Sequence, residues 1–288
     1  MPLLHLGLGG PRWLDWTVHV DALLLSMALA YAYYFAVTEL RPRVSDAGRV
    51  RRGQVALFAA GVVALYAAGG TPLHDLGEEH LLSAHMLQHF IFTGIAAPLL
   101  LAGTPGWLWE WLITSTRSQR IASFLTRPVV AFSVFNGLLV FTHLPPLVDF
   151  ALHVGAFHFG VHAALVLSAM LMWWPILSPL AQYPRLSPPL QMGYLFLQSV
   201  LPAVIASFIT FSDRPVYEFY ANAPRIWGIS PTDDQQIAGG IMKLLGSIEL
   251  WGFMAVIFFR WYNREQAEAQ GPPWNEVEAE LEEIVAKR

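Results

Sequence analysis

The chain has 288 residues, of which 55% are hydrophobic and 13% are charged, and its formal net charge is −4. A soluble domain carries about a quarter charged residues, so the composition favours a membrane protein over a soluble, disordered or fibrous one. The acidic balance offers no basic field for nucleic acid. The sequence has no cysteine, which excludes disulfides, iron–sulfur clusters and thiolate metal sites.

Seven apolar runs are long enough to cross a membrane. A bilayer core about 30 Å thick needs roughly 20 mostly apolar residues per helix. The sequence therefore predicts an all-α membrane protein. Its fold would be a bundle of seven transmembrane helices within residues 1–263, with spans near 16–38, 54–69, 81–102, 128–147, 156–177, 190–211 and 237–261.

The ends of the last run carry two further patterns. Thr232–Gln235 has the spacing of a capping box that would open the seventh span. Residues 264–288 form an acidic tail in which Val277, Leu281 and Ile284 recur at helical spacing. This spacing fits a short amphipathic helix, although a solvated tail is an equally good reading.

The basic residues predict an orientation in the membrane. Cytoplasmic loops carry the excess of Lys and Arg. One side of the predicted bundle has only Arg12, Arg214 and Arg225, and Lys243 falls inside the seventh run. The other side has thirteen: Arg41, Arg43, Arg49, Arg51, Arg52, Arg117, Arg120, Arg127, Arg185, Arg260, Arg264, Lys287 and Arg288. The N-terminus is therefore expected outside and the C-terminus in the cytoplasm.

All ten histidines fall toward the predicted outer side. His85 and His89 lie in the first turns of the third span, and His158 and His162 in the first turns of the fifth. Each pair has i,i+4 spacing, so its two rings project from one face of a helix. The others end the fourth span (His143) or lie in outer segments: His5, His19, His74, His80 and His153.

Two facing histidine pairs are typical of a site for a metal or for haem. A single histidine near a membrane interface is more often a hydrogen-bonded residue than a ligand, but two pairs at one level reverse that preference. Imidazole suits copper, zinc, iron and nickel, and a thioether favours Cu(I). The predicted ligands are His85, His89, His143, His158 and His162, with His80 and Met86 as weaker candidates.

Two other polar residues fall in the seventh run. Lys243 lies at a depth similar to that of His85, where it either snorkels to the surface or pairs with an anionic group. Glu249 lies nearer the middle of the helix and is expected to face the bundle as a hydrogen-bonded or protonated carboxyl. A retinal protein is disfavoured, because the run 81–102 contains no carboxylate to act as a counter-ion.

Short segments in this order resemble the CtaG family of multi-span cytochrome c oxidase assembly factors. The similarity runs from about the second span to the seventh, and one difference is Lys243, where the family typically places tryptophan. The segments are His85-Met-Leu-Gln-His89, Ala97–Pro105, Thr142-His143-Leu144-Pro145 with Asp149, His158-Phe-Gly-Val-His162, Trp173–Leu177 and Asp234–Met242.

The resemblance implies a non-enzymatic factor that matures a haem-copper oxidase in a bacterial-type plasma membrane. It would handle copper on the outer side, with an oxidase subunit and a copper chaperone as partners, and five of its histidine positions match: His85, His89, His143, His158 and His162. Two alternatives remain open. Facing histidines can ligate a single b-type haem in a redox protein, or the protein is a metal-free structural assembly chaperone.

Overall fold

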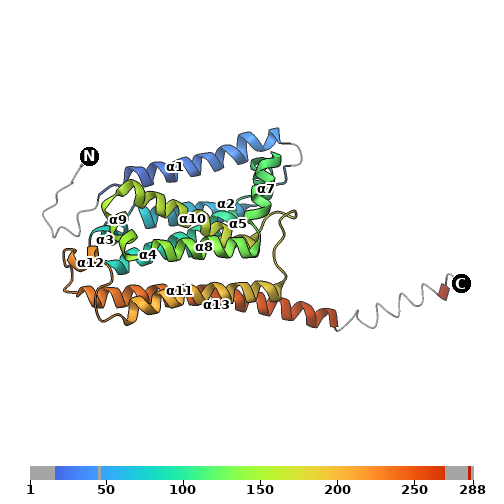
Figure 1. The fold of residues 1–288 in the computed structure, drawn as a ribbon. Helices are drawn as coiled ribbons and strands as arrows, with labels where there is room; N and C mark the ends of the chain where they lie inside the picture. Colours follow the sequence, from blue (N-terminus) through green and yellow to red (C-terminus); the bar gives the residue numbers. More distant parts are fainter. Residues whose placement is uncertain (1–16, 45–46, 270–284, 287–288) are drawn as a thin grey trace.

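The computed structural model describes residues 17–44, 47–269 and 285–286. Every regular element in these residues is a helix, as the all-α prediction requires. The helices run along one another in a bundle (Figure 1). The bounds are α1 Val20–Phe35, η2 Ala36–Leu40, η3 Arg41–Arg43, α2 Arg52–Gly69, α3 Pro72–Glu79, α4 Leu82–Phe90, η4 Ile91–Ala96, α5 Ala97–Gly103, α6 Gly106–Leu112, α7 Thr116–Leu125, α8 Pro128–Thr142, α9 Pro145–His153, α10 Gly155–Leu177, α11 Pro188–Phe211, α12 Glu218–Asn222 and α13 Pro231–Ala269.

Six segments are long and apolar enough to cross a membrane, and five of them fall within a few residues of predicted spans. These five are Val20–Arg43, Arg52–Gly69, Leu82–Gly103, Gly155–Leu177 and Pro188–Phe211. The sixth, Pro231–Ala269, begins before and ends after the expected 237–261. Its last turns therefore include residues 264–269 of the expected tail, whose proposed amphipathic helix lies outside the described residues.

The fourth predicted span, 128–147, is too long. Helix α8 ends at Thr142, and the prolines at 145 and 146 begin a separate helix, α9. Proline suits the first turn of a helix because it has no N–H to donate. With 15 residues, α8 alone is too short to cross a membrane. Only α7 and α8 together are long and apolar enough, and the two are bent by 74° relative to each other. The fold thus has six candidate spans, or seven if this bent pair crosses as one.

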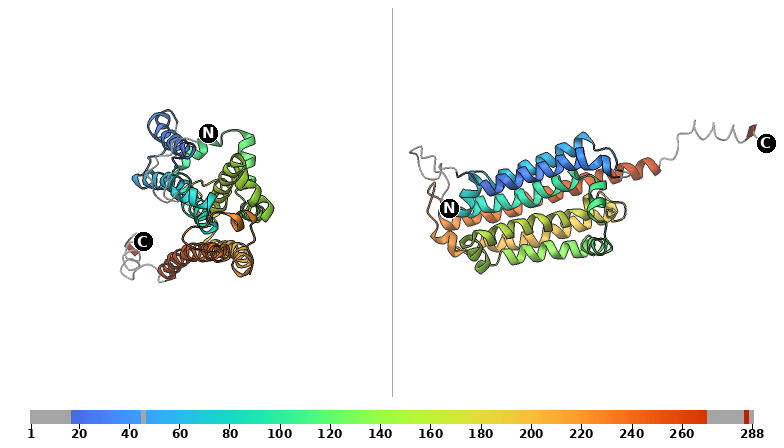
Figure 2. Two further views of the ribbon diagram at one scale, coloured as in Figure 1. Left: turned by 90° about the vertical axis from the view of Figure 1, so that its left-hand side faces the viewer. Right: turned by 90° about the horizontal axis from the view of Figure 1, so that it is seen from above.

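Helices α4, η4 and α5 form one continuous segment, Leu82–Gly103, near the middle of the bundle. Helices α11 and α13 pack along each other on one side of it, and α1 lies on the opposite side (Figures 1 and 2). The η4 part is a π-helix of six residues, in which the i→i−4 hydrogen bonds are interrupted. The indole N–H of the fully buried Trp173 donates to the Thr93 carbonyl there, at 3.1 Å.

Histidines and most basic residues lie at opposite ends of the bundle. The nine described histidines lie in or beside α3, α4 and α9, near the start of α1 and α10, or at the end of α8. Arginines concentrate in η3, α7 and the last turns of α13, at the other end in Figure 1. His5 lies outside the described residues. For the other nine histidines, the one-sided arrangement predicted from the sequence is present.

Asp234 of α13 caps the N-terminus of a different helix, α4. Its carboxylate accepts hydrogen bonds from the backbone N–H groups of Leu82 and Ser83 at 2.7 and 3.1 Å, and from the Ser83 hydroxyl at 2.5 Å. Asp234 is 1% exposed. The first N–H groups of a helix have no partner within it, so this carboxylate both satisfies them and fixes where α4 begins.

The predicted capping box at Thr232–Gln235 is wrong in its register. Helix α13 begins at Pro231, so Thr232 already lies inside it. The cap is Ser230, whose hydroxyl accepts from the N–H of Asp233 at 3.1 Å and donates to the Asp233 carboxylate at 2.6 Å. The choice of cap shifted by two residues because Ser and Thr are equally good caps in sequence.

Replacement Asp234→Ala is expected to destabilise the protein. It removes hydrogen bonds to an ionised acceptor and leaves two buried N–H groups without a partner, at a cost of about 2–4 kcal/mol. Thermal unfolding in detergent should show a lower midpoint. Asp213→Ala is the matched control, since Asp213 is exposed and has no hydrogen bond or ion pair to another described residue. Equal midpoints for the two variants would contradict the capping role.

Candidate metal centre

Four imidazoles from two helices meet at one end of the bundle. His85 and His89 come from α4, and His158 and His162 from α10. One ring nitrogen of each lies within 4.8 Å of one ring nitrogen of every other. The Nε2 atoms of His89 and His162 are 3.2 Å apart, and the rings of His85 and His158 are stacked with centroids 5.3 Å apart. These residues are called the four-histidine group below.

Helical geometry explains this convergence. Residues four apart on a helix lie one above the other, and the two rings of each pair are in contact, with centroids 4.3 Å apart in α4 and 4.2 Å in α10. Gly77 of α3 allows that helix to lie close behind α4, because a Cβ there would be 3.0 Å from the His85 backbone nitrogen. The two predicted pairs therefore come together as the sequence indicated.

The fifth predicted ligand, His143, lies beside this group. Its ring centroid is 6.1 Å from that of His89. Its Nδ1 donates to the Leu139 carbonyl at 2.8 Å, so its Nε2 carries the lone pair. That Nε2 is buried and has no hydrogen-bond partner among the described residues.

Neither of the two weaker candidates, His80 and Met86, belongs to the four-histidine group. His80 Nδ1 lies 3.2 Å from the Pro224 carbonyl, outside the four-histidine group. Met86 is 2% exposed and packs with Leu82 and Ile209 in an apolar cluster. Met86 also lines a cavity of about 100 Å³ that His89 and His143 border.

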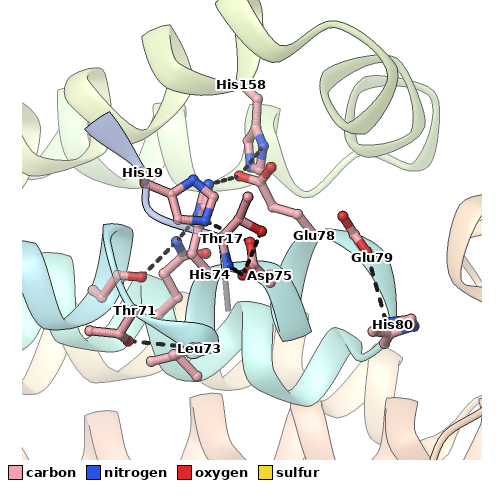
Figure 3. Close-up of polar contacts among 12 residues, drawn as sticks. Thr17, His19, Thr71, Leu73, His74, Asp75, Glu78, Glu79, His80 and His158 are labelled. Carbon is pink, nitrogen blue, oxygen red and sulfur yellow. Dashed lines mark hydrogen bonds and ion pairs between the residues drawn. The ribbon is translucent and has the colours of Figure 1, made fainter. Parts of the chain in front are cut away.

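Glu78 is a site residue that the sequence prediction missed. The same carboxylate oxygen, Oε1, lies 2.9 Å from His158 Nδ1 and 3.0 Å from His74 Nε2 (Figure 3). Burial by itself would raise the pKa of Glu78, but the hydrogen bonds from His158 and His74 outweigh it and lower that pKa to about 2. An ionised carboxylate only accepts, so both histidines donate to it.

This bond fixes the tautomer of His158. With its proton on Nδ1, His158 presents the lone pair of Nε2, which is buried and unpaired. A carboxylate that accepts from the far nitrogen of a histidine is the usual outer partner of a metal ligand. Buried nitrogens without a partner cost free energy unless something binds them. His85 Nδ1 and His89 Nδ1 are likewise buried and have no hydrogen-bond partner among the described residues. The donor set fits a metal ion.

Gln88, which is fully buried in α4, contacts the second ring nitrogen of His74. Its amide nitrogen donates to the Ala68 carbonyl at 3.0 Å and lies 2.7 Å from His74 Nδ1. Since His74 Nε2 donates to Glu78, its Nδ1 is free to accept from Gln88. A chain of hydrogen bonds thus runs from Gln88 through His74 and Glu78 to His158.

The cavity next to His89 reaches toward the middle of the bundle. Glu249 lines it and lies against Gly94 in η4, at the place where a Cβ would otherwise sit. The predicted inward direction of Glu249 is therefore confirmed. Lys243 is exposed and borders the same cavity. Neither side chain has a hydrogen bond or an ion pair to another described residue.

Residues 212–230 cover this end of the bundle. The hydroxyl of Tyr220 donates to the Gly77 carbonyl at 2.6 Å, and that of Tyr217 donates to the His143 carbonyl at 3.1 Å. The Tyr220 ring lies 6.2 Å from that of His85. His85 and His158 are consequently enclosed, at only 4% and 3% exposed, whereas His89 is half-buried and borders the cavity.

The arrangement defines a class of protein: a multi-span helical bundle that holds a buried, carboxylate-supported histidine group at one end. The family model described as cytochrome c oxidase caa3 assembly factor (Caa3_CtaG) matches residues 31–264. The chain therefore belongs to that family, as its motifs indicated.

Individual relatives are more distant. Two uncharacterised mycobacterial proteins, Mb0105 of Mycobacterium bovis and MT0111 of Mycobacterium tuberculosis, are each 24% identical over 208 residues. The match covers 66% of this chain and 31% of each relative, so the chain spans about a third of their length. No solved structure matches the chain.

Replacement Glu78→Gln is expected to weaken the binding of a metal ion by the four histidines. Loss of a carboxylate that orients a ligand costs about 10–100-fold in affinity. Competition against a coloured chelator measures this in detergent-solubilised protein. Glu79→Gln is the control, because the Glu79 side chain is 68% exposed and its contact with His80 Nε2 is 3.9 Å long. Equal affinity in both variants would contradict the role of Glu78.

Proposed function

We propose that this protein binds copper at the four-histidine group and supplies it to a haem-copper oxidase subunit during assembly. The observation that carries the proposal is the set of buried ring nitrogens without partners, on His85, His89 and His158, within a group whose donor atoms lie within 4.8 Å of one another. Membership of a family of cytochrome c oxidase assembly factors supports an oxidase as the recipient of the copper.

The donor chemistry favours copper among the possible ions. Imidazole suits copper, zinc, iron and nickel, whereas hard cations such as magnesium prefer oxygen ligands. Copper is also the metal that the named oxidase class contains. The imidazoles themselves are neutral ligands, and the Glu78 carboxylate beside His158 offsets part of the charge of a bound cation.

The distribution of charge supports an outer location for this site. Arginines gather at the opposite end of the bundle from the histidines, and the positive-inside rule places such an end in the cytoplasm. The copper site would then face the outside of a bacterial-type plasma membrane. A copper chaperone on that side would be the donor of the ion.

The geometry favours an ion over the haem alternative. Two axial histidines hold a flat macrocycle between them, and here all four donor nitrogens lie within 4.8 Å of one another. A macrocycle between any two of these rings would have to displace the other two. Absorption spectra separate the two readings: a Soret band in protein purified from haem-replete cells would favour haem.

The test is copper content after replacement of all four histidines, His85, His89, His158 and His162, by alanine. Wild-type protein from copper-replete cells is expected to hold copper, and the quadruple variant to hold almost none, because no imidazole of the group remains. Elemental mass spectrometry of the purified proteins measures the copper content of both. His153→Ala is the control, since His153 is exposed and its Nδ1 contacts only the Asp149 carbonyl of its own helix, at 2.6 Å.

Oxidase activity in the same cells tests the delivery step. The quadruple variant should leave the oxidase inactive for lack of copper, whereas added copper salt should restore part of the activity. Unchanged copper content in that variant would overturn the proposal. Normal oxidase activity together with lost copper would instead favour the metal-free structural chaperone.

A further inference from the structure

Two histidine–carboxylate pairs lie next to each other on the solvent side of the four-histidine group. His19, just before α1, has its Nε2 2.6 Å from Asp75 Oδ1. His74 has its Nε2 3.0 Å from Glu78 Oε1. The rings of His19 and His74 are in edge contact, with centroids 4.4 Å apart (Figure 3). These four residues are called the outer group.

The outer group is more accessible than His158, the imidazole of the four-histidine group that shares Glu78 with it. The side chains of His19 and Asp75 are each 19% exposed, and those of His74 and Glu78 are 16% and 29% exposed. The side chain of His158 is only 4% exposed. An ion arriving from solvent would therefore meet the outer group before it could contact a buried imidazole.

Glu78 belongs to both groups. A single oxygen of its carboxylate bonds His74 on the exposed side and His158 on the buried side. The ring of His74 is also 6.4 Å, centroid to centroid, from that of His162. Only one carboxylate thus separates the two sets of ligands, so an ion held in the outer group would already be adjacent to the inner one.

We propose that the outer group is a second cation site, which takes a divalent ion such as Cu(II) or Zn(II) and passes it to the four-histidine group. Its two carboxylates and two imidazoles are the oxygen and nitrogen donors that suit these ions. Binding releases to solvent the proton that each imidazole Nε2 shares with its carboxylate, so that the nitrogen can act as a ligand. The carboxylates also lower the electrostatic cost of bringing a cation from water toward neutral imidazoles. Transfer exchanges ligands without a change in oxidation state.

The competing reading is that these pairs only fasten α1 to α3. Asp75 Oδ2 also lies within hydrogen-bond reach of the Thr17 hydroxyl, at 3.2 Å, and of its N–H, at 3.3 Å. Such a fastening predicts a loss of stability on mutation with no change in metal stoichiometry. The two readings are therefore separable by counting ions.

The proposal rests on the proposed function, so the experiment tests the two groups separately. Full-length protein in detergent is titrated with Zn²⁺, which has no redox chemistry, and then with Cu²⁺. The outer variant combines His19→Ala with Asp75→Asn, which leaves the bonds of Glu78 to His74 and His158 in place. It is compared with the quadruple histidine variant and with the combination of both.

Wild-type protein is expected to bind two ions per chain. The outer variant should bind one ion, at the four-histidine group, and the quadruple variant should bind one ion more weakly, at the outer group. The combination of both should bind none. Wild-type stoichiometry in the outer variant would overturn the outer site, and so would a complete loss of binding in the quadruple variant. Wild-type stoichiometry in the quadruple variant would instead overturn the proposed function. His153→Ala should behave as wild type throughout.

Loading kinetics test the passage of the ion. Removing a carboxylate from the mouth of a site slows cation association about tenfold, so stopped-flow filling of the four-histidine group should be slower in the outer variant by about that factor. Thermal midpoints measured alongside show whether the outer variant is merely less stable. An unchanged filling rate would show that the ion does not pass through the outer group.

Discussion

The shared carboxylate of Glu78 is the interaction on which the histidine end of this bundle depends. Imidazoles buried away from water need partners for both ring nitrogens, and a membrane bundle has few to offer. By accepting from His74 and His158 at 3.0 and 2.9 Å, one carboxylate uses a single nitrogen of each ring. The other nitrogen of His158 is left facing the group, which is the state a metal ligand requires. The same short helix, α3, thereby connects solvent with the buried site.

The backbone around the site is held by contacts that span most of the chain. Asp234, more than 150 residues from Ser83, fixes the first turn of α4, and Tyr220 ties the covering segment to the Gly77 carbonyl. Such long-range bonds determine where His85 stands relative to α3 and α10. Preorganisation of this kind keeps the ring nitrogens of the four-histidine group close together, so the proposed ion would require little further ordering on binding.

The sequence allowed the helical class, the ends of most spans and the meeting of the two histidine pairs to be predicted. These follow from local patterns, namely apolar run length and i,i+4 spacing. Glu78, Gln88 and Asp234 were missed as site residues because their partners are distant in sequence or lie on another helix. The one local signal for Glu78 was its i,i+4 spacing from His74, which ordinarily indicates nothing more than a surface pair. The fourth span failed for a different reason: apolar content continued past His143, while the prolines at 145 and 146 started a new helix.

The π-helix η4 has a consequence for how this bundle tolerates change. A π-helical turn is equivalent to one extra residue inserted into an α-helix, and each residue turns an α-helix by about 100°. The face that α4 presents to α10 and the face that α5 presents to α2 are therefore offset by this single insertion. A deletion of one residue within Ile91–Ala96 would restore a regular helix and rotate the two halves against each other. The number of residues in this segment therefore sets the rotation, about the helix axis, of the histidine-bearing face of α4 relative to the packing face of α5.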